Sequence, residues 1–268
     1  MTKKVLTIAG SDAGGGSGIQ ADLKTFQEFG LFGISTITSI LSVNPHTKKP
    51  QIFSIPENII QQQLAVAFSG GPLSSVKIGL LQQPNLIKIV EATLLGNKQT
   101  NIVIDPVLAV KVTDDRLQTD VITEMLTRLL PISRVITPNL VEAQMLSGID
   151  TIHSKEDMIL AAKRIHQYGV QNVVIKGGHR FPGENALDLF YDGESTHFLS
   201  EPKINLNTNH GAGCTFAAAI TAGLAQGMTP LEATIKAKKF VYCAISHGLY
   251  LNNFTGYVWH GAYNQIKD

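Results

Sequence analysis

One short segment joins a thiol to the start of a helix. Asn209–Cys214 reads Asn-His-Gly-Ala-Gly-Cys and stands directly before a smooth helical run over residues 215–226. Glycines before a helix leave backbone N–H groups free at the positive end of the helix dipole, an arrangement that binds anions. A helix start also lowers a thiol pKa, so we predict a chemical role for Cys214. Cys243, on the last long helical stretch, is predicted to be a small buried hydrophobic residue.

A second segment, Gly10–Gly18, carries five glycines between a predicted strand and a predicted helix. Such a loop lets a ligand approach the backbone closely, although a flexible tight turn would use the same residues. The loop lacks the Gly-Lys-Ser/Thr of a Walker loop, and its spacing does not fit Gly-x-Gly-x-x-Gly. Asp22, in the helix behind it, could bind a ligand or only complement the helix dipole.

Polar residues follow three further predicted strands. Asp105 is a carboxylate at a strand tip, Asn139 and Glu142 stand three apart at a helix start, and Lys176 precedes a glycine turn. Asn139 and Glu142 are also typical of a helix cap, and Lys176 of a solvated loop charge. Together, an anion hole with a thiol, a phosphate-binding lysine and carboxylates for Mg²⁺ are the parts that phosphoryl transfer to a small molecule needs.

The composition excludes several classes of protein. The 268 residues carry 22 Lys+Arg against 21 Asp+Glu, and a net charge of +1 does not supply the basic field of an ordinary nucleic-acid-binding protein. Two cysteines are too few for a disulfide-stapled secreted domain. No apolar run approaches the roughly 20 residues of a membrane span, and the first residues are too polar for a signal peptide. We therefore expect a cytoplasmic protein that binds neither nucleic acid nor a membrane.

Short β-branched runs alternate with amphipathic stretches, which predicts an α/β fold with a mainly parallel sheet covered on both faces. No linker or repeat interrupts the pattern, so we predict one domain over residues 1–268. The predicted strands are 5–9, 34–43, 76–81, 101–108, 134–137, 172–176, 186–191 and 195–199. The predicted helices are 19–29, 56–68, 84–95, 117–130, 158–168, 215–226 and 230–247. Ligands bind beyond the carboxyl ends of such strands, where segments 10–18, 79–81, 105–107, 137–142 and 176–179 are expected to meet.

The stretch Ala9–Phe26 resembles the N-terminal signature of hydroxymethylpyrimidine and phosphomethylpyrimidine kinases, which belong to the ribokinase-like superfamily. Asn139–Glu142 matches the Asn-x-x-Glu motif of that superfamily. His210–Thr215 resembles its anion-hole motif, with Cys214 where sugar kinases carry Asp. The resemblance runs from about residue 5 to the C-terminus, and it implies a three-layer α/β/α sandwich that is usually a homodimer.

Further residues resemble one subgroup, the pyridoxal kinases of this type from Gram-positive bacteria. They are Asn253–Gly256, His260–Asn264, Ala212, Leu146–Gly148 and Tyr191–Gly193. Pyrimidine kinases usually have Gln at the position of Val43, and its absence favours a pyridoxal kinase. The subgroup also carries a second cysteine at the position of Val110 and a Gly at that of Val112, after the retained Lys111. A mechanism that uses two cysteines therefore cannot operate here. In the subgroup these residues belong to a lid over the site, and how this lid behaves with Val110 and Val112 stays open.

The resemblance implies a role for each site residue. Cys214 would be the base for a substrate CH₂OH, and the N–H groups of Gly211, Ala212 and Gly213 would hold the transferring phosphoryl group. The ring pocket would be lined by Gly10, Asp22, Val43, Leu80 and Val107. ATP would be bound by Asn139, Lys176, Asp188 and Gly213, and Mg²⁺ by Glu142 and Asp105. A requirement for a monovalent cation stays open.

We therefore predict an ATP-dependent kinase that phosphorylates the CH₂OH of pyridoxal, pyridoxine or pyridoxamine in vitamin B6 salvage. The alternative is a hydroxymethylpyrimidine/phosphomethylpyrimidine kinase of thiamine biosynthesis. Because Val43 stands where pyrimidine kinases usually have Gln, the pocket lacks a polar group that would discriminate between the two substrates. The glycine spacing, and the lack of an acidic residue at the end of strand 34–43, disfavour a Rossmann oxidoreductase. The presence of Cys214, Lys176 and Glu142 disfavours a non-catalytic vitamin-binding protein.

Overall fold

A nine-stranded sheet runs through the part of the chain that the structure describes, in the order β3-β2-β1-β4-β5-β6-β7-β8-β9. Strands β2, β1, β4, β5, β6 and β7 are parallel, whereas β3 at one edge and β8 and β9 at the other are antiparallel. Their bounds are Lys4–Asp12 (β1), Phe32–Val43 (β2), Pro50–Ser54 (β3), Ser75–Ile78 (β4), Ile102–Ile104 (β5), Val135–Ile136 (β6), Asn172–Lys176 (β7), Asn185–Tyr191 (β8) and Thr196–Pro202 (β9).

The computed structural model describes residues 2–44, 46–47, 49–71, 73–108, 115–253 and 255–266. Val110, Lys111 and Val112, the positions of the expected lid, lie outside these ranges. A second, two-stranded antiparallel sheet is formed near the C-terminus by β10 (Leu249–Asn252) and β11 (Thr255–Tyr257). No helix within the described ranges is both long enough and apolar enough to cross a membrane.

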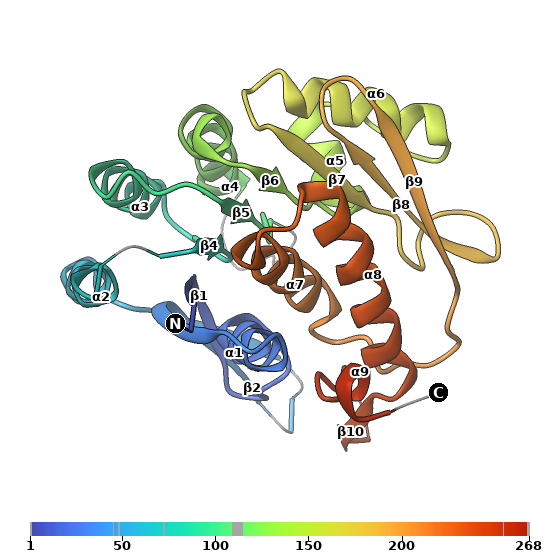
Figure 1. Cartoon of the computed structure of the whole chain (residues 1–268), viewed down its shortest axis with the longest axis horizontal. Helices are drawn as coiled ribbons and strands as arrows, with labels where there is room; N and C mark the ends of the chain where they lie inside the picture. The colour runs from blue at the N-terminus through green and yellow to red at the C-terminus, as the bar shows by residue number, and fades with distance from the viewer. Residues whose placement is uncertain are drawn as a thin grey trace.

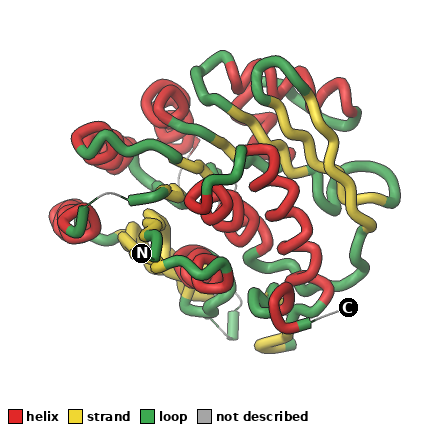
Figure 2. Tube along the Cα trace, in the orientation of Figure 1, coloured by secondary structure: helices red, strands yellow, loops and turns green. Residues whose placement is uncertain are grey.

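Helices cover both faces of the sheet and confirm the predicted three-layer α/β/α arrangement (Figures 1 and 2). One face is covered by α1 (Gly18–Glu28), α7 (Ala212–Gln226) and α8 (Pro230–Ser246). The other is covered by α2 (Glu57–Ser69), α3 (Pro84–Gly96), α4 (Asp115–Glu124), α5 (Leu140–Ser147) and α6 (Lys155–His166), with a π-helical turn at Met125–Leu129 and a 3₁₀ turn at Leu130–Ile132. A short α9 (Ala262–Gln265) packs against α8.

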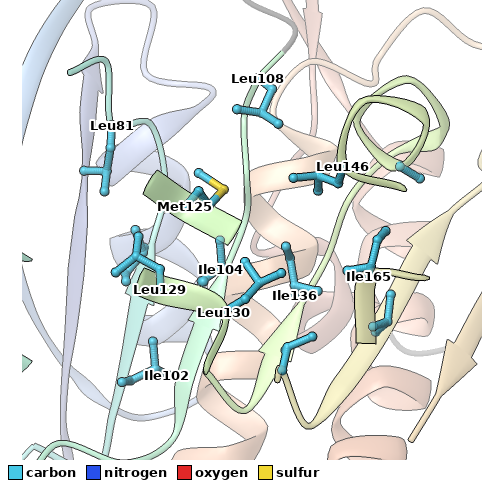
Figure 3. Close-up of a cluster of buried hydrophobic side chains, with 14 of the residues drawn as sticks. Leu81, Ile102, Ile104, Leu108, Met125, Leu129, Leu130, Ile136, Leu146 and Ile165 are labelled. Atoms are coloured by element: carbon cyan, nitrogen blue, oxygen red, sulfur yellow. The ribbon is translucent and has the colours of Figure 1, made fainter. Parts of the chain in front are cut away.

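Each central strand contributes to two hydrophobic cores because successive side chains of a strand point to opposite faces. On β5, Val103 packs in the core that contains Phe216 of α7. Its neighbours Ile102 and Ile104 pack in the opposite core with Leu129, as the close-up in Figure 3 shows. These strands are therefore buried on both faces, which explains why they are continuous apolar runs in the sequence.

Most predicted elements are confirmed to within a few residues, and the differences have local causes. The predicted strand 101–108 ends at Ile104, ahead of Pro106, which cannot donate a ladder hydrogen bond. Pro56 is the N-cap of α2 and not its first residue. Helix α6 begins earlier than the predicted residue 158, because Ser154 forms a capping box in which its side chain accepts from the Asp157 N–H. Strands β3, β10 and β11 are short and were not predicted.

The carboxyl ends of β1, β4, β5, β6 and β7 lie at one edge of the sheet because these strands are parallel. The five segments expected to meet at this edge each follow one of these strands, so that expectation is confirmed. The chain passes from β1 to β2 on one side and then to β4 on the other, which makes the β1/β4 boundary a topological switch point. Ligands bind at such points in open α/β sheets.

Candidate active site

The anion hole is built at the start of α7. Gly211 is the N-cap of this helix and has a φ of +86°, a left-handed conformation that favours glycine. A Cβ atom at this position would also collide with the Gly16 carbonyl oxygen. Gly211, Ala212 and Gly213 are all partly exposed, so their N–H groups can reach a ligand at the positive end of the helix dipole.

The Cys214 thiol follows the anion hole in the first turn of α7 and is partly exposed. Burial of the thiol raises its pKa to about 11, although the charge of Lys77 and a hydrogen bond from the Gly18 N–H both lower it. The expectation of a lowered pKa for the Cys214 thiol is therefore wrong. A helix start stabilises a thiolate, but here the loss of hydration outweighs that effect.

Lys77 lies near Cys214, although no motif in the sequence pointed to this lysine. Lys77 of β4 and Asp22 of α1 form an ion pair of 3.0 Å, and both side chains are fully buried. Lys77 Nζ lies beside Gly79, where a Cβ atom would be 2.9 Å away from it. A lysine inside the apolar run of residues 76–81 is the signal that could have found this pair, because lysines are almost never fully buried without a partner.

Only one of the two oxygens of the Asp22 carboxylate has hydrogen-bond partners in the described structure. Its Oδ2 atom accepts from Lys77 and from the Thr7 hydroxyl, whereas its buried Oδ1 atom has no partner in the described structure. Burial raises the pKa of Asp22 against the opposing charge of Lys77. The Asp22 side chain is fully buried, and its contact with the substrate ring stays a prediction.

The ammonium group of Lys176 pairs with Asp105 and lies near enough to Glu142 for their charges to interact. Lys176 Nζ lies 2.9 Å from Asp105 Oδ1. Burial favours the neutral acid at Asp105, but Lys176 and Lys77 outweigh burial and hold the pKa of Asp105 below its ordinary value. Glu142 is 4% exposed, and burial raises its pKa despite the attraction of Lys176. The structure therefore brings together the carboxylates predicted for Mg²⁺ and the lysine predicted for phosphate.

The Asn139 and Glu142 pair forms a capping box at the start of α5. Asn139 Oδ1 accepts from the N–H groups of Val141 and Glu142, and Glu142 Oε2 accepts from the Asn139 N–H at 2.9 Å. Its other oxygen, Oε1, accepts from the Leu108 N–H at 3.3 Å. The helix cap that the sequence left open is thus confirmed, and it fixes Glu142 beside Lys176.

The Asp188 carboxylate holds a turn. Its Oδ1 atom accepts from the N–H groups of Gly177 and Gly178 at 3.0 and 3.3 Å, and its Oδ2 atom lies 2.7 Å from Lys238 Nζ. Asp188 is 6% exposed. Its oxygens are therefore engaged by the protein, and it shapes the turn that follows Lys176.

A cavity of about 430 Å³ opens between this turn and the anion hole, and it is lined by all four residues predicted to bind ATP: Asn139, Lys176, Asp188 and Gly213. Its remaining wall includes residues 203–207 after β9 and one side of α8, with Val241, Tyr242 and Ile245. This wall carries no motif, so it could not be predicted from the sequence. Lys176, Arg180, Lys203 and Lys238 make the lining cationic, which suits phosphate.

The residues predicted for the ring pocket are only partly brought together. Gly10 lies beside Leu80, because a Cβ atom on Gly10 would be 3.8 Å from Leu80 Cδ2. Val107 is partly exposed beyond β5 and has a φ of +43°, a strained value for a β-branched residue. Val43 lies at the end of β2, paired with Pro50 and 43% exposed.

Comparisons with known proteins decide the family. Residues 12–259 match the model of a family described as phosphomethylpyrimidine kinase. The chain belongs to the phosphomethylpyrimidine kinase family. A putative pyridoxine kinase from Staphylococcus epidermidis is 44% identical over 265 residues, which cover 99% of this chain and 96% of the relative.

Two further similar proteins are named for different substrates. A hydroxymethylpyrimidine/phosphomethylpyrimidine kinase from Haemophilus influenzae is 41% identical over 98% of each chain. The structure of the pyridoxal kinase from Staphylococcus aureus in complex with AMP-PCP is 43% identical, covers 100% of this chain and 96% of its own, and has a TM-score of 0.95. The ribokinase-like fold that the sequence resemblance implied is confirmed.

Proposed function

We propose that this kinase transfers the terminal phosphoryl group of ATP to the CH₂OH of pyridoxal, pyridoxine or pyridoxamine. The observation that carries the proposal is that Cys214 directly follows the Gly211–Gly213 anion hole, of which Gly213 lines the cationic cavity, and lies near enough to the buried Lys77 for its charge to lower the thiol pKa. The similarity to pyridoxine and pyridoxal kinases over almost the whole chain supports the choice of substrate.

Cys214 takes the proton of the substrate hydroxyl while the hydroxyl oxygen bonds to phosphorus and the bond to the ADP oxygen breaks. A thiol with a pKa of about 11 is mostly protonated near neutral pH. The transition state is loose, so the alcohol becomes acidic only late, and a small ionised fraction of the thiol suffices. Lys77 favours this thiolate, and the N–H groups of Gly211, Ala212 and Gly213 stabilise charge on the transferring group.

The carboxylates of Asp105 and Glu142 fit Mg²⁺, which is commonly held by one or two carboxylates together with substrate phosphates. Mg²⁺ bound there would neutralise charge on those phosphates. Lys176 pairs with Asp105 and its charge also acts on Glu142, and it would move its contacts to the nucleotide phosphates. Asn139 and Asp188 orient these groups, the first through the helix cap and the second through the Gly177–Gly178 turn.

The ring of the substrate would lie over Gly10, Leu80 and Val107, with Val43 at the entrance and Asp22 underneath. A homodimer is part of the proposal, supported by the apolar pair Ile40 and Phe53, which face each other across β2 and β3 and are 42% and 55% exposed. Since the reaction consumes ATP, we expect the enzyme in the cytoplasm.

The test is ADP release measured side by side on pyridoxal, pyridoxine, hydroxymethylpyrimidine and its monophosphate, with Cys214→Ala as the control. We expect the highest kcat/KM on pyridoxal or pyridoxine and lower turnover on hydroxymethylpyrimidine. A preference for hydroxymethylpyrimidine and phosphorylation of its monophosphate would favour the thiamine pathway. Binding of the vitamin without ADP release would show a non-catalytic vitamin-binding protein.

A further inference from the structure

The carboxylate of Asp12 gathers donors from two distant parts of the chain. Its Oδ1 atom accepts from the Gly14 N–H at 2.8 Å, and its Oδ2 atom accepts from the Ser17 N–H and hydroxyl at 2.9 and 2.8 Å. The same Oδ2 atom lies 3.1 Å from His210 Nε2. Burial favours the neutral acid, but hydrogen bonds from His210, Ser17 and Gly14 hold the pKa of Asp12 well below its ordinary range.

His210 is fixed by its backbone as well as by its ring. Its N–H donates to the Gly256 carbonyl at 3.1 Å, and its own carbonyl accepts from the Val258 N–H at 3.2 Å. Its ring packs edge-on against Tyr257, with 5.0 Å between the ring centroids. The C-terminal strand β11 therefore holds His210 in place. Gly211 of the anion hole directly follows His210 in the chain, so the position of His210 also constrains the anion hole.

The glycine loop and the anion hole touch without room for side chains. A Cβ atom on Gly211 would collide with the Gly16 carbonyl, and a Cβ atom on Gly16 would collide with the Tyr257 ring. Gly18, at the end of the same loop, donates its N–H toward the Cys214 sulfur. A shift of the loop relative to the helix start would therefore move a donor away from the sulfur.

We propose that Asp12 and His210 form a positioning pair that fixes the glycine loop against the anion hole, so that the Gly18 N–H and the Gly211–Gly213 N–H groups keep their places around Cys214. The pair touches neither the substrate nor the reacting atoms. It acts through loop 14–17 on one side and through Gly211 on the other. The inference rests on the proposed kinase activity only for its kinetic consequence.

The first test is the series His210→Leu, His210→Gln and Asp12→Asn, assayed by ADP release with pyridoxine. A displacement of about 1 Å in a catalytic group can cost roughly 10²-fold, so we expect kcat of His210→Leu to fall by 10-fold to 100-fold. KM for ATP should change little, because Lys176 and the cavity wall are intact. His210→Gln should recover most of the rate, since its amide N–H can replace the Nε2 donor.

A double-mutant cycle shows whether the two residues act through their shared contact. Asp12→Asn combined with His210→Leu should then lower kcat little more than the worse single variant does. The matched control is His197→Leu, an exposed histidine on β9, which should keep the wild-type kcat. Melting temperatures are measured in parallel, and all rates are taken well below them.

A second readout does not depend on kinase activity. The rate of Cys214 alkylation by iodoacetamide at pH 8, followed by peptide mass spectrometry, should fall in His210→Leu because the thiolate loses the Gly18 donor. An unchanged kcat and alkylation rate in His210→Leu would overturn the proposal, as would His210→Gln behaving like His210→Leu. If the wild type released no ADP with any substrate, the proposed function would fail, while the alkylation series would still decide the coupling.

Discussion

Lys77 Nζ lies 3.0 Å from Asp22 Oδ2, and solvent reaches neither side chain. The ion pair joins β4 to α1 beneath the predicted ring pocket. Burial of an unpaired charge is costly, so each member of the pair makes the other tolerable. Lys77 also stands close enough to Cys214 to lower the thiol pKa, which connects the stability of the sheet to the chemistry of the site.

Removing one member of this pair should destabilise the fold. Lys77→Met leaves Asp22 buried and uncompensated, and we expect the free energy of unfolding in urea to fall by about 3–5 kcal/mol. Lys77→Met combined with Asp22→Leu should restore most of the stability but not the kcat, because the cation beside Cys214 is still missing. Full activity in that double variant would show that the pair is only structural. Arg128→Met, which breaks solvent-exposed ion pairs with Glu124 and Glu91, is the control and should lower the free energy of unfolding far less.

The ionisation of Cys214 should appear in a pH profile. The folded thiol has a pKa of about 11, above the ordinary value, so the thiolate fraction grows as pH rises toward 11. Alkylation of Cys214 by iodoacetamide should therefore rise about tenfold per pH unit from neutral pH upward, beyond the roughly 8.5 at which an ordinary thiol levels off. A plateau near that value would contradict the desolvation argument.

Replacement of the thiol itself should slow the reaction. We expect Cys214→Ala to lower kcat by roughly 10²-fold or more, as is typical when a general base is lost. Cys214→Asp should keep partial activity, because a carboxylate can accept the same proton. An unchanged kcat in the alanine variant, measured as ADP release, would exclude Cys214 as the base.

Glu142 has one role in the capping box of α5 and a second role in the proposed Mg²⁺ site, and one substitution can separate the two. Glu142→Gln keeps one oxygen that can accept from the Asn139 N–H, so the capping box should persist, but its amide N–H₂ cannot accept from the Leu108 N–H, so we expect a small fall in the urea midpoint. The loss of charge should raise the Mg²⁺ concentration for half-maximal activity by about tenfold, in the range seen when a metal site loses a supporting group. Asp157→Asn alters the equivalent box at Ser154 and should leave the Mg²⁺ dependence unaltered. An unaltered Mg²⁺ dependence in Glu142→Gln would remove Glu142 from the metal site.

Val43 tests the origin of substrate preference. Val43→Gln adds a hydrogen-bonding group at the entrance, and we expect kcat/KM for hydroxymethylpyrimidine to rise relative to pyridoxine by roughly tenfold. Phe32→Gln, at the other end of the same strand and 60% exposed, is the matched control and should leave the ratio unchanged. An unchanged ratio in Val43→Gln would place residue 43 outside the reach of the ring.

Features that depend on neighbours along the chain could be predicted from the amino-acid order alone. Local conformation and periodicity indicate the glycines before α7, the helix caps at Asn139 and Ser154, and the buried strands. The structure contains all of these features. The parallel order of the strands then places their polar ends at one edge. This is why Asp105, Glu142 and Lys176 could be assigned to one site before any distance was known.

Features that depend on burial could be assigned only from the three-dimensional packing of the chain. The thiol pKa of Cys214 is raised and not lowered, because desolvation outweighs the helix start and depends on everything packed around the sulfur. Asp188 is engaged by Lys238, which lies on α8 and is 50 residues away along the chain. Lys77 and Asp22 likewise meet across 55 residues. Charges in a protein interior are set by their partners in space, and a single sequence does not show those partners.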